Sequence, residues 1–147
     1  TVSEMEKIVS SSRWGHVSNA GYYVLGNMSF NEKKYEQARR YYLAQADRRP
    51  SSQFSALALH RAAIASEYLG NHQDALELYK RLERDHATGM LADQLYYDLG
   101  RMYQKRSDVF KAREYYHKVI TSHPNSPFSL RARQRLLLLS ASDKNVK

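Results

Sequence analysis

The sequence predicts an all-α solenoid of stacked antiparallel helix pairs, and the first observation behind this prediction is an internal repeat. Adjacent tyrosines occur at positions 22–23 and 41–42, and again 74 residues later at 96–97 and 115–116. Half of 74 is 37, and two residue types recur at that spacing: Ala38, Ala75 and Ala112, then Tyr42, Tyr79 and Tyr116. The second observation is that apolar residues recur every three or four positions, without the strict alternation of a strand.

The 37-residue period divides the 147-residue chain into three repeats within one domain. We expect a partial repeat or helix at 1–18, repeats at 19–55, 56–92 and 93–129, a capping helix at 130–141 and a disordered tail at 142–147. Trp14 is expected to pack at the N-terminal end. Because Thr1 is not a methionine and no apolar signal segment follows it, we expect a processed chain or a fragment of a longer repeat protein.

Each repeat is expected to form two helices. In the third repeat, Leu95, Leu99 and Met102 recur at helical spacing and define one face of the first helix. Val109 and Tyr116 fall on one face of the second helix in the same way. The first and middle repeats follow this pattern, which predicts three helix pairs.

Capping residues mark the breaks between the helices. Ser107 suits an N-cap, with Asp108 as an acidic residue in the first turn. Gly70 suits the left-handed position at a helix C-terminus. Between the last repeat and the capping helix, Ser126 and Pro127 are typical of an N-cap followed by the first helical residue.

Small residues stand twelve positions apart, one on each helix of a pair: Gly26 with Ala38, and Gly100 with Ala112. Their missing side chains predict that the two antiparallel helices of a pair approach closely. The tyrosines at 42, 79 and 116 are then expected to fill the space between neighbouring pairs. Because one pair cannot bury its apolar face alone, the pairs are expected to stack.

The third repeat resembles the tetratricopeptide repeat at six signature positions: Leu99, Gly100, Tyr103, Ala112, Tyr116 and Pro124. The first repeat carries a second copy of the signature and the middle repeat a more divergent third, so the resemblance covers residues 19–140. It implies a right-handed superhelix that acts as a protein–protein interaction scaffold. Repeats of this family usually have about 34 residues.

The longer 37-residue unit resembles a bacterial envelope subtype of this family. It is similar to the repeats of the outer-membrane-assembly lipoprotein and of the Tol–Pal-associated periplasmic coordinator. This similarity implies a role in cell-envelope assembly and a location in the bacterial periplasm or cell envelope, with the cytoplasm as the alternative.

The sequence lacks the motifs of catalysis and of metal or cofactor binding. There are no cysteines, the six glycines form no phosphate-binding loop, and no two of the six histidines stand four positions apart. We therefore expect no enzyme activity, no metal and no cofactor. The longest apolar run has four residues, whereas a membrane-spanning helix needs about 20, so no membrane span is expected.

The resemblance implies a partner-binding groove on the first helix of each pair, because in this family the first helices line a concave surface. Tyr23 and Tyr97 are expected to be its aromatic anchors, since Leu25 and Leu99 supply the core face of the same helices. The groove residues carried over from the family are Tyr23, Asn27, Phe30, Asn31, His60, Ile64, Glu67, Tyr68, Tyr97, Arg101, Gln104, Lys105, Arg131 and Gln134. The expected partner is another protein or a peptide segment.

Two alternatives stay open. In the first, the repeats are a structural or oligomerising segment that binds further repeats of a longer chain or a second copy of itself. The sequence does not predict the oligomeric state. The net charge of +8 would instead suit an acidic ligand or RNA. That site would be the basic C-terminal end, formed by Arg101, Lys105, Arg106, Arg131, Arg133 and Arg135. Nucleic acid is less favoured, because positions 27, 64 and 101 share no base-reading chemistry.

Overall fold

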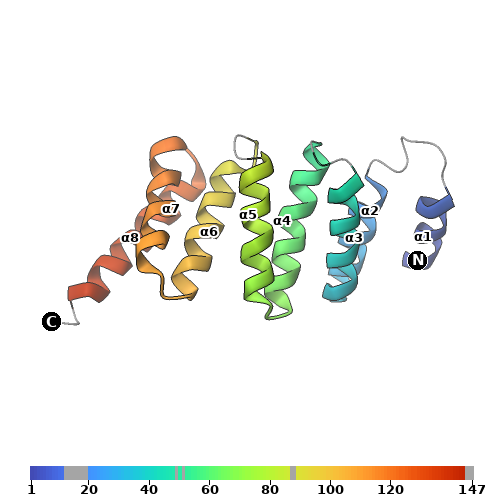
Figure 1. Ribbon diagram of the computed structural model, residues 1–147, viewed down its shortest axis with the longest axis horizontal. Coiled ribbons are helices and arrows are strands. Elements are labelled where there is room, and N and C mark those ends of the chain that lie inside the picture. The colour runs from blue at the N-terminus through green and yellow to red at the C-terminus, as the bar shows by residue number, and fades with distance from the viewer. Residues whose placement is uncertain (12–19, 49, 51, 87–88, 145–147) are drawn as a thin grey trace. The chain divides into compact units, whose positions relative to one another are not determined.

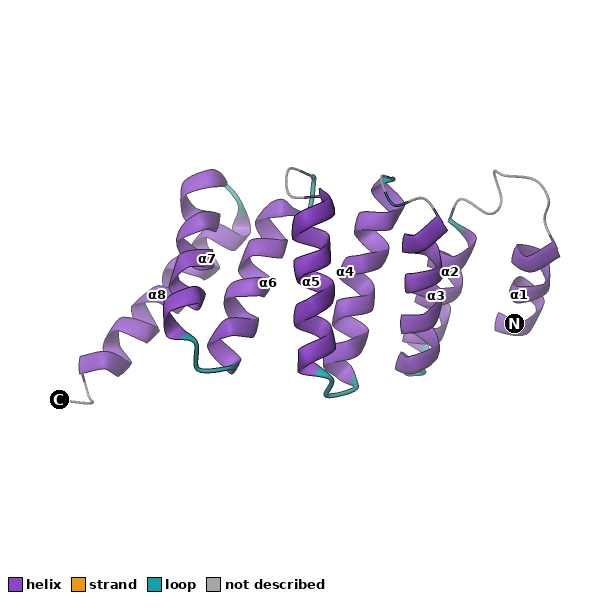
Figure 2. Cartoon of the chain, in the orientation of Figure 1, coloured by secondary structure: helices purple, strands orange, loops and turns teal. Residues whose placement is uncertain are grey.

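The computed structural model describes residues 1–11, 20–48, 50, 52–86 and 89–144, which contain helices and no strand (Figures 1 and 2). The chain divides into two compact units, an N-terminal unit (Thr1–Gly89) and a C-terminal unit (Met90–Lys147). The N-terminal unit contains α1 (Val2–Ser11), α2 (Gly21–Asn31), α3 (Tyr35–Arg48), α4 (Gln53–Tyr68) and α5 (His72–His86). The C-terminal unit contains α6 (Ala92–Lys105), α7 (Val109–Ser122) and α8 (Pro127–Lys144). The predicted all-α repeat fold is confirmed.

Successive helices pack on one another within each unit. In the N-terminal unit α2 pairs with α3, α4 pairs with α5, and α3 also packs on α4. In the C-terminal unit α6 pairs with α7, and α8 packs on α7. The first helices of successive pairs also touch, since α2 contacts α4 and α6 contacts α8. Each unit therefore presents neighbouring first helices.

The turn inside each helix pair has one backbone form in all three repeats. Lys33, Gly70 and Ser107 lie 37 residues apart and have left-handed φ angles of 61°, 77° and 61°. The N–H of the following residue then donates to the carbonyl five positions earlier, at 2.9, 2.9 and 3.0 Å: Lys34 to Ser29, Asn71 to Ser66 and Asp108 to Tyr103. This is the bond pattern of a Schellman motif. The predicted left-handed role of Gly70 is confirmed.

The predicted N-cap at Ser107 is wrong by one residue. Asp108 is the N-cap of α7, and its Oδ1 accepts a hydrogen bond from the Lys111 N–H at 3.1 Å. The Schellman turn requires a left-handed residue directly before the next cap, and Ser107 occupies that position. Ser126 and Pro127 lie as predicted, because Pro127 begins α8 and Ser126 Oγ accepts a hydrogen bond from the Phe128 N–H at 3.0 Å.

Gly26 and Gly100 leave space for a tyrosine ring of the partner helix, not for a direct contact between the two helix backbones. A Cβ atom on Gly100 would lie 2.6 Å from Cε1 of Tyr116, and one on Gly26 would collide with the ring of Tyr42 in the same way. Each ring comes from the other helix of the same pair, so these two tyrosines pack inside their own pairs. In these two pairs the glycine leaves space for the ring, whereas the middle repeat has Ala63 at the corresponding position.

The capping helix is longer than expected. α8 begins at Pro127 and continues to Lys144, instead of spanning 130–141. It begins earlier because proline at the first helical position has a suitable fixed φ. It continues further because no glycine or proline follows Leu139. The first three residues of the expected tail are therefore helical, and the rest of that tail lies outside the described residues.

The N-terminal end is a helix that packs on the first pair. Val9 of α1 is 2% exposed and forms a core with Leu25 of α2 and Tyr41 of α3. A Cβ on Gly21 would lie 2.7 Å from Cγ2 of Val9, so α1 closely approaches the start of α2. Trp14 and the remainder of the expected segment 1–18 lie outside the described residues.

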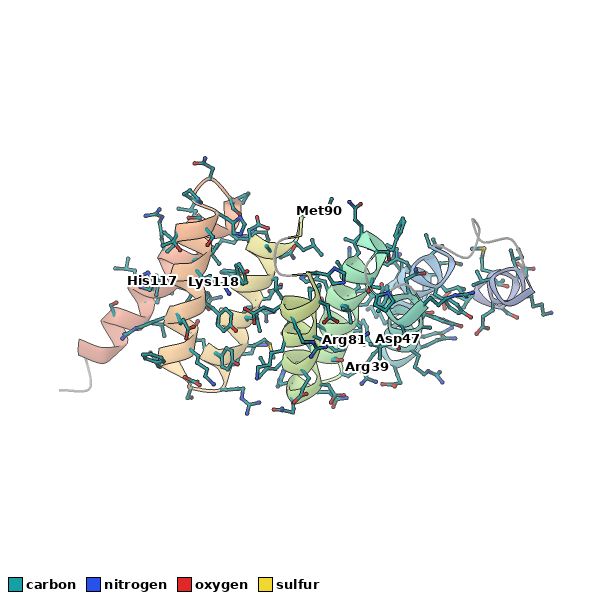
Figure 3. The ribbon with its side chains drawn as sticks, turned by 45° about the horizontal axis from the view of Figure 1, so that its top comes forward. Arg39, Asp47, Arg81, Met90, His117 and Lys118 are labelled. Atoms are coloured by element: carbon teal, nitrogen blue, oxygen red, sulfur yellow. The ribbon has the colours of Figure 1, made fainter. Side chains whose placement is uncertain are left out.

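Two ion pairs join the second helices of the N-terminal unit. Arg39 Nη2 of α3 lies 2.9 Å from Oδ2 of Asp74 in α5. Arg81 Nη2 of α5 lies 2.7 Å from Oδ1 of Asp47 in α3, and Figure 3 labels both of these residues. The polarity is reversed between the two pairs, so each helix supplies one cation and one anion. Because these groups are partly exposed, each pair is worth up to about 1 kcal/mol. The two ion pairs therefore join the second helices α3 and α5 to each other.

Candidate partner-binding surfaces

Buried tyrosines position polar side chains on the first helices. The rings of the tyrosines at 42, 79 and 116 are fully buried. Their hydroxyls donate to Asn27, Glu67 and Gln104 at 2.8, 2.9 and 2.8 Å. All three acceptors belong to the predicted groove. Each is therefore held by a contact that begins in the core, and its side-chain position is largely fixed before any partner binds.

In the first repeat the acceptor lies at a different position of the repeat from the acceptors in the other two. Glu67 and Gln104 stand twelve residues before their tyrosines, but the corresponding residue of the first repeat is Phe30, which cannot accept a hydrogen bond. Asn27, one helical turn earlier, accepts it instead. The twelve-residue spacing is a sequence signal that could have identified this bond in two of the three repeats.

The buried hydroxyls stay neutral over a wide pH range. Burial raises the pKa of Tyr42 to about 12, against a weaker opposing effect of the positive charge of Arg61. Burial likewise raises the pKa of Tyr116 to about 12, opposed in part by Arg135. Both hydroxyls therefore remain hydrogen-bond donors at neutral pH, and they keep their acceptors oriented.

Tyr23 belongs to an aromatic triad in the N-terminal unit. Its ring centroid lies 5.8 Å from that of Tyr42 in α3 and 6.5 Å from that of Phe54 in α4. The Tyr23 side chain is half-buried and Phe54 is 41% exposed. The triad thus runs from the core to the surface across three helices, and its outer two rings can contact a ligand.

A second aromatic cluster lies at the other end of the same first helices. Phe30, Tyr35 and Tyr68 pack together with centroid distances of 5.1 Å, 5.3 Å and 4.7 Å. The Tyr35 and Tyr68 rings are stacked, and Tyr68 is 61% exposed. Phe30 and Tyr68 were predicted site residues, and the structure brings them together. Tyr35, on α3, was not predicted.

The C-terminal unit carries a second aromatic triad with the same layout. The Tyr97 centroid lies 5.8 Å from that of Tyr116 in α7 and 5.6 Å from that of Phe128 in α8. All three residues stand 74 positions after their counterparts in the N-terminal unit. The phenylalanines at 54 and 128 were missed as site residues, although their identity at that offset was a usable signal.

Arginines surround the second triad. Arg101 Nη2 lies 3.1 Å from Oδ1 of Asp98, which is 7% exposed. The Arg131 guanidinium lies over the Phe128 ring at 5.3 Å from its centroid. A hydrogen bond with Tyr97 raises the pKa of Arg135, so this group is cationic at any physiological pH. The C-terminal surface is therefore both aromatic and cationic.

The predicted groove residues lie on α2 and α4 in one unit and on α6 and α8 in the other. α2 holds Tyr23, Asn27, Phe30 and Asn31; α4 holds His60, Ile64, Glu67 and Tyr68; α6 holds Tyr97, Arg101, Gln104 and Lys105; α8 holds Arg131 and Gln134. All but His60 are half-buried or exposed. His60 is 5% exposed, and its ring packs 5.8 Å from that of Tyr79, so it offers little surface to a partner.

The described part of the chain contains no group of three or more side chains that could hold a metal ion. Its helices are also too short or too polar to cross a lipid bilayer.

The chain matches a family model in two segments. Residues 57–88 and 94–126 match the tetratricopeptide repeat. These segments lie within the second and third predicted repeats and cover most of the helix pairs α4–α5 and α6–α7. No curated protein sequence matches the chain.

Several solved structures are similar in fold. The crystal structure of MamA has a TM-score of 0.77 and 20% identity, covering 97% of this chain and 77% of that chain. PcrH in complex with the chaperone binding region of PopD has a TM-score of 0.74 and 14% identity, covering 90% and 98%. The first tetratricopeptide domain of Spaghetti (RPAP3) bound to an HSP90 peptide has a TM-score of 0.65 and 20% identity, covering 80% and 86%. These two segments are therefore similar to the tetratricopeptide repeat, and the chain shares its fold with the solved structures.

Proposed function

We propose that the chain is a non-enzymatic scaffold that binds a peptide or partner segment on the first helices of its helix pairs. The observation that carries this proposal is the duplicated aromatic triad. In both copies a half-buried tyrosine on a first helix rests on a fully buried tyrosine of the second helix. Aromatic anchors on a rigid support lose little conformational entropy when they bind, which favours affinity.

The similar structures support this class of function. Two of them are complexes with a segment of another protein, the PopD chaperone binding region for PcrH and an HSP90 peptide for RPAP3. A tetratricopeptide fold is typically an interaction scaffold, and the described residues of this chain show no feature that points to catalysis. The proposed ligand of this chain is a segment of another protein.

Site-specific crosslinking tests the proposal. A photoreactive amino acid replaces Asn31 in the N-terminal unit or Gln134 in the C-terminal unit, both exposed positions of the proposed surface. The matched control carries it at Lys80, an exposed residue of the second helix α5. We expect a discrete crosslinked protein at the first two positions and not at Lys80. Equal crosslinking at all three would contradict a surface confined to the first helices.

The bacterial cell envelope is the proposed setting of this binding. The 37-residue repeat is the feature that supports it, through its resemblance to envelope members of the family. Fractionation of cells that express the tagged full-length protein would test the setting. Recovery from the periplasm or envelope supports it, and recovery from the cytoplasm alone would remove it while leaving the scaffold function intact.

A further inference from the structure

Helix α8 carries apolar side chains on two opposite faces. On one face, Ala132 and Leu139 are 0% and 7% exposed. On the other, Leu130 and Leu137 are 63% and 72% exposed. At about 100° per residue, Leu130 and Leu137 lie within about 20° of each other, and Leu139 lies about 180° from Leu130. A helix that is apolar on both sides is typical of one packed on both sides.

The repeat period identifies what this exposed face corresponds to. Leu137 stands 37 residues after Gly100, and Gly100 is the position that faces the second helix of its own pair. The exposed side of α8 is therefore the side on which a second helix would pack. Among the described residues, α8 is the last helix and no second helix covers this face.

The occupant of this face differs from an ordinary second helix of the repeat. In the pair α6–α7 the glycine is needed because the Tyr116 ring would collide with a Cβ there. Leu137 fills that space with a whole side chain, so a helix that brings a tyrosine to this position does not fit. A helix with aliphatic side chains at the contact fits better, because leucines on both helices interdigitate.

The charged residues of α8 indicate which side chains should flank the apolar stripe of the partner. Arg133 is exposed on α8, and Arg131 is exposed on the other side of the leucine stripe. α8 has no acidic residue before Asp143. The C-terminal unit as a whole has 11 Lys and Arg against 5 Asp and Glu, a formal charge of +6. This charge disfavours a second copy and favours an acidic partner.

We propose that the exposed face of α8 docks an amphipathic helix of another protein, with an aliphatic stripe flanked by aspartate or glutamate. Leu130 and Leu137 are the apolar contacts, and Arg133 contributes the charge at the edge. This surface is additional to the proposed groove, because none of these three residues belongs to that set. The two proposals can therefore fail independently.

Two labelled peptides test the proposal by fluorescence anisotropy. Both are 18-residue helices with one leucine stripe, flanked by glutamate in the acidic peptide and by lysine in the basic peptide. We expect the acidic peptide to bind the whole chain at least about tenfold more tightly than the basic one at low salt. Leu137→Gln should weaken that binding about tenfold or more, without lowering the melting temperature, since the side chain is mostly exposed.

Two further variants make the test specific. Phe110→Gln, at an 81% exposed position of α7, is the matched control and should leave peptide binding unchanged. Arg133→Glu should reduce the preference for the acidic peptide by several-fold. Binding that ignores Leu137→Gln, or no preference between the peptides, would overturn the proposal. So would a dimer in sedimentation that Leu137→Gln converts to a monomer, because the occupant would then be a second copy.

Discussion

The two aromatic triads are nearly the same in geometry and differ in charge. Tyr23 and Tyr97 lie 5.8 Å from their buried tyrosines in both copies, with interplanar angles of 51° and 46°. The residue one turn after each anchor is Asn27 in the N-terminal unit and Arg101 in the C-terminal unit. The rings thus form a common frame, and the residues around it set the electrostatic character of each surface.

Another position of the repeat also differs in charge from one repeat to the next. Arg61, Asp98 and Arg135 stand 37 residues apart. In the C-terminal unit Asp98 pairs with Arg101, which reduces the positive charge beside Tyr97. Arg131, on the next first helix, has a leucine as its counterpart at position 57. The C-terminal surface therefore gains its cations from two positions that are neutral in the N-terminal copy.

The largest predicted effect tests whether the two frames are equivalent. Gly26→Leu and Gly100→Leu should each destabilise the chain by about 3 kcal/mol or more, because the side chain collides with a buried tyrosine ring. The free energy of unfolding from urea titration measures this. Lys80→Leu, at an exposed site, is the control and should stay within about 0.5 kcal/mol. A small cost at one glycine only would show that the two aromatic triads differ in their packing.

Lys118 would be a poor control, because its Nζ lies 4.1 Å from the centroid of the Tyr96 ring.

The second prediction concerns the half-buried anchors. Once a partner is identified by crosslinking, Tyr23→Ala and Tyr97→Ala should each weaken its binding by about 1–2 kcal/mol. Because each ring also packs on a buried tyrosine, the unfolding free energy should fall by about 1 kcal/mol. Binding at the Tyr97 surface should depend on salt more strongly than binding at the Tyr23 surface, since Arg101 and Arg131 have neutral counterparts in the N-terminal unit. Variants that melt early and yet bind normally would place both tyrosines in the core.

The third prediction concerns the buried hydroxyls. Tyr42→Phe and Tyr116→Phe should each cost about 1 kcal/mol at neutral pH, because an acceptor on a first helix loses its hydrogen bond. In the folded chain the pKa of both tyrosines is about 12, above the usual value of about 10 for an unfolded tyrosine. Their stabilising contribution is therefore complete below about pH 10 and is lost as the pH rises toward 12.

The measurement is the unfolding free energy of each variant between pH 8 and pH 12. The two phenylalanine variants should lose less stability than the unaltered chain over this range, because they lack the group that ionises. A pH dependence identical in all three proteins would contradict the burial of these hydroxyls.

Much of the fold followed from the sequence because the repeat amplifies local signals. A single left-handed glycine at Gly70 was readable from residue type, since glycine tolerates positive φ. Ser107 was misread because serine favours an N-cap by its own chemistry, and only its alignment with Gly70 marks it as left-handed. The packing of the Tyr42 and Tyr116 rings on Gly26 and Gly100 was not predicted. It depends on side-chain rotamers and on space inside the pair, which residue spacing does not encode.

The candidate site followed from the sequence less completely. The first-helix positions came from family resemblance, and the structure adds what holds them: a tyrosine hydroxyl on Asn27, Glu67 and Gln104. Phe54 and Phe128 were missed because they sit near the start of the next first helix, where a residue is assigned to the joint between repeats rather than to a surface. Contacts between helices far apart in sequence determine such sites.

The smallest predicted effect concerns the repeated turn. Lys33 in the N-terminal unit and Ser107 in the C-terminal unit both hold a left-handed φ of 61°, which costs a residue with a side chain about 1 kcal/mol relative to glycine. Lys33→Gly and Ser107→Gly should therefore raise the unfolding free energy by about 0.5–1 kcal/mol, partly offset by the greater entropy of glycine in the unfolded chain. Gly70→Ala should have the opposite sign and a similar size. Chemical denaturation of the three variants and of a Lys34→Gly control would measure these differences. Equal stabilisation at Lys33 and Ser107 would extend the equivalence of the two units from the triad to the backbone, whereas destabilisation at either site would show that its side chain makes a compensating contact.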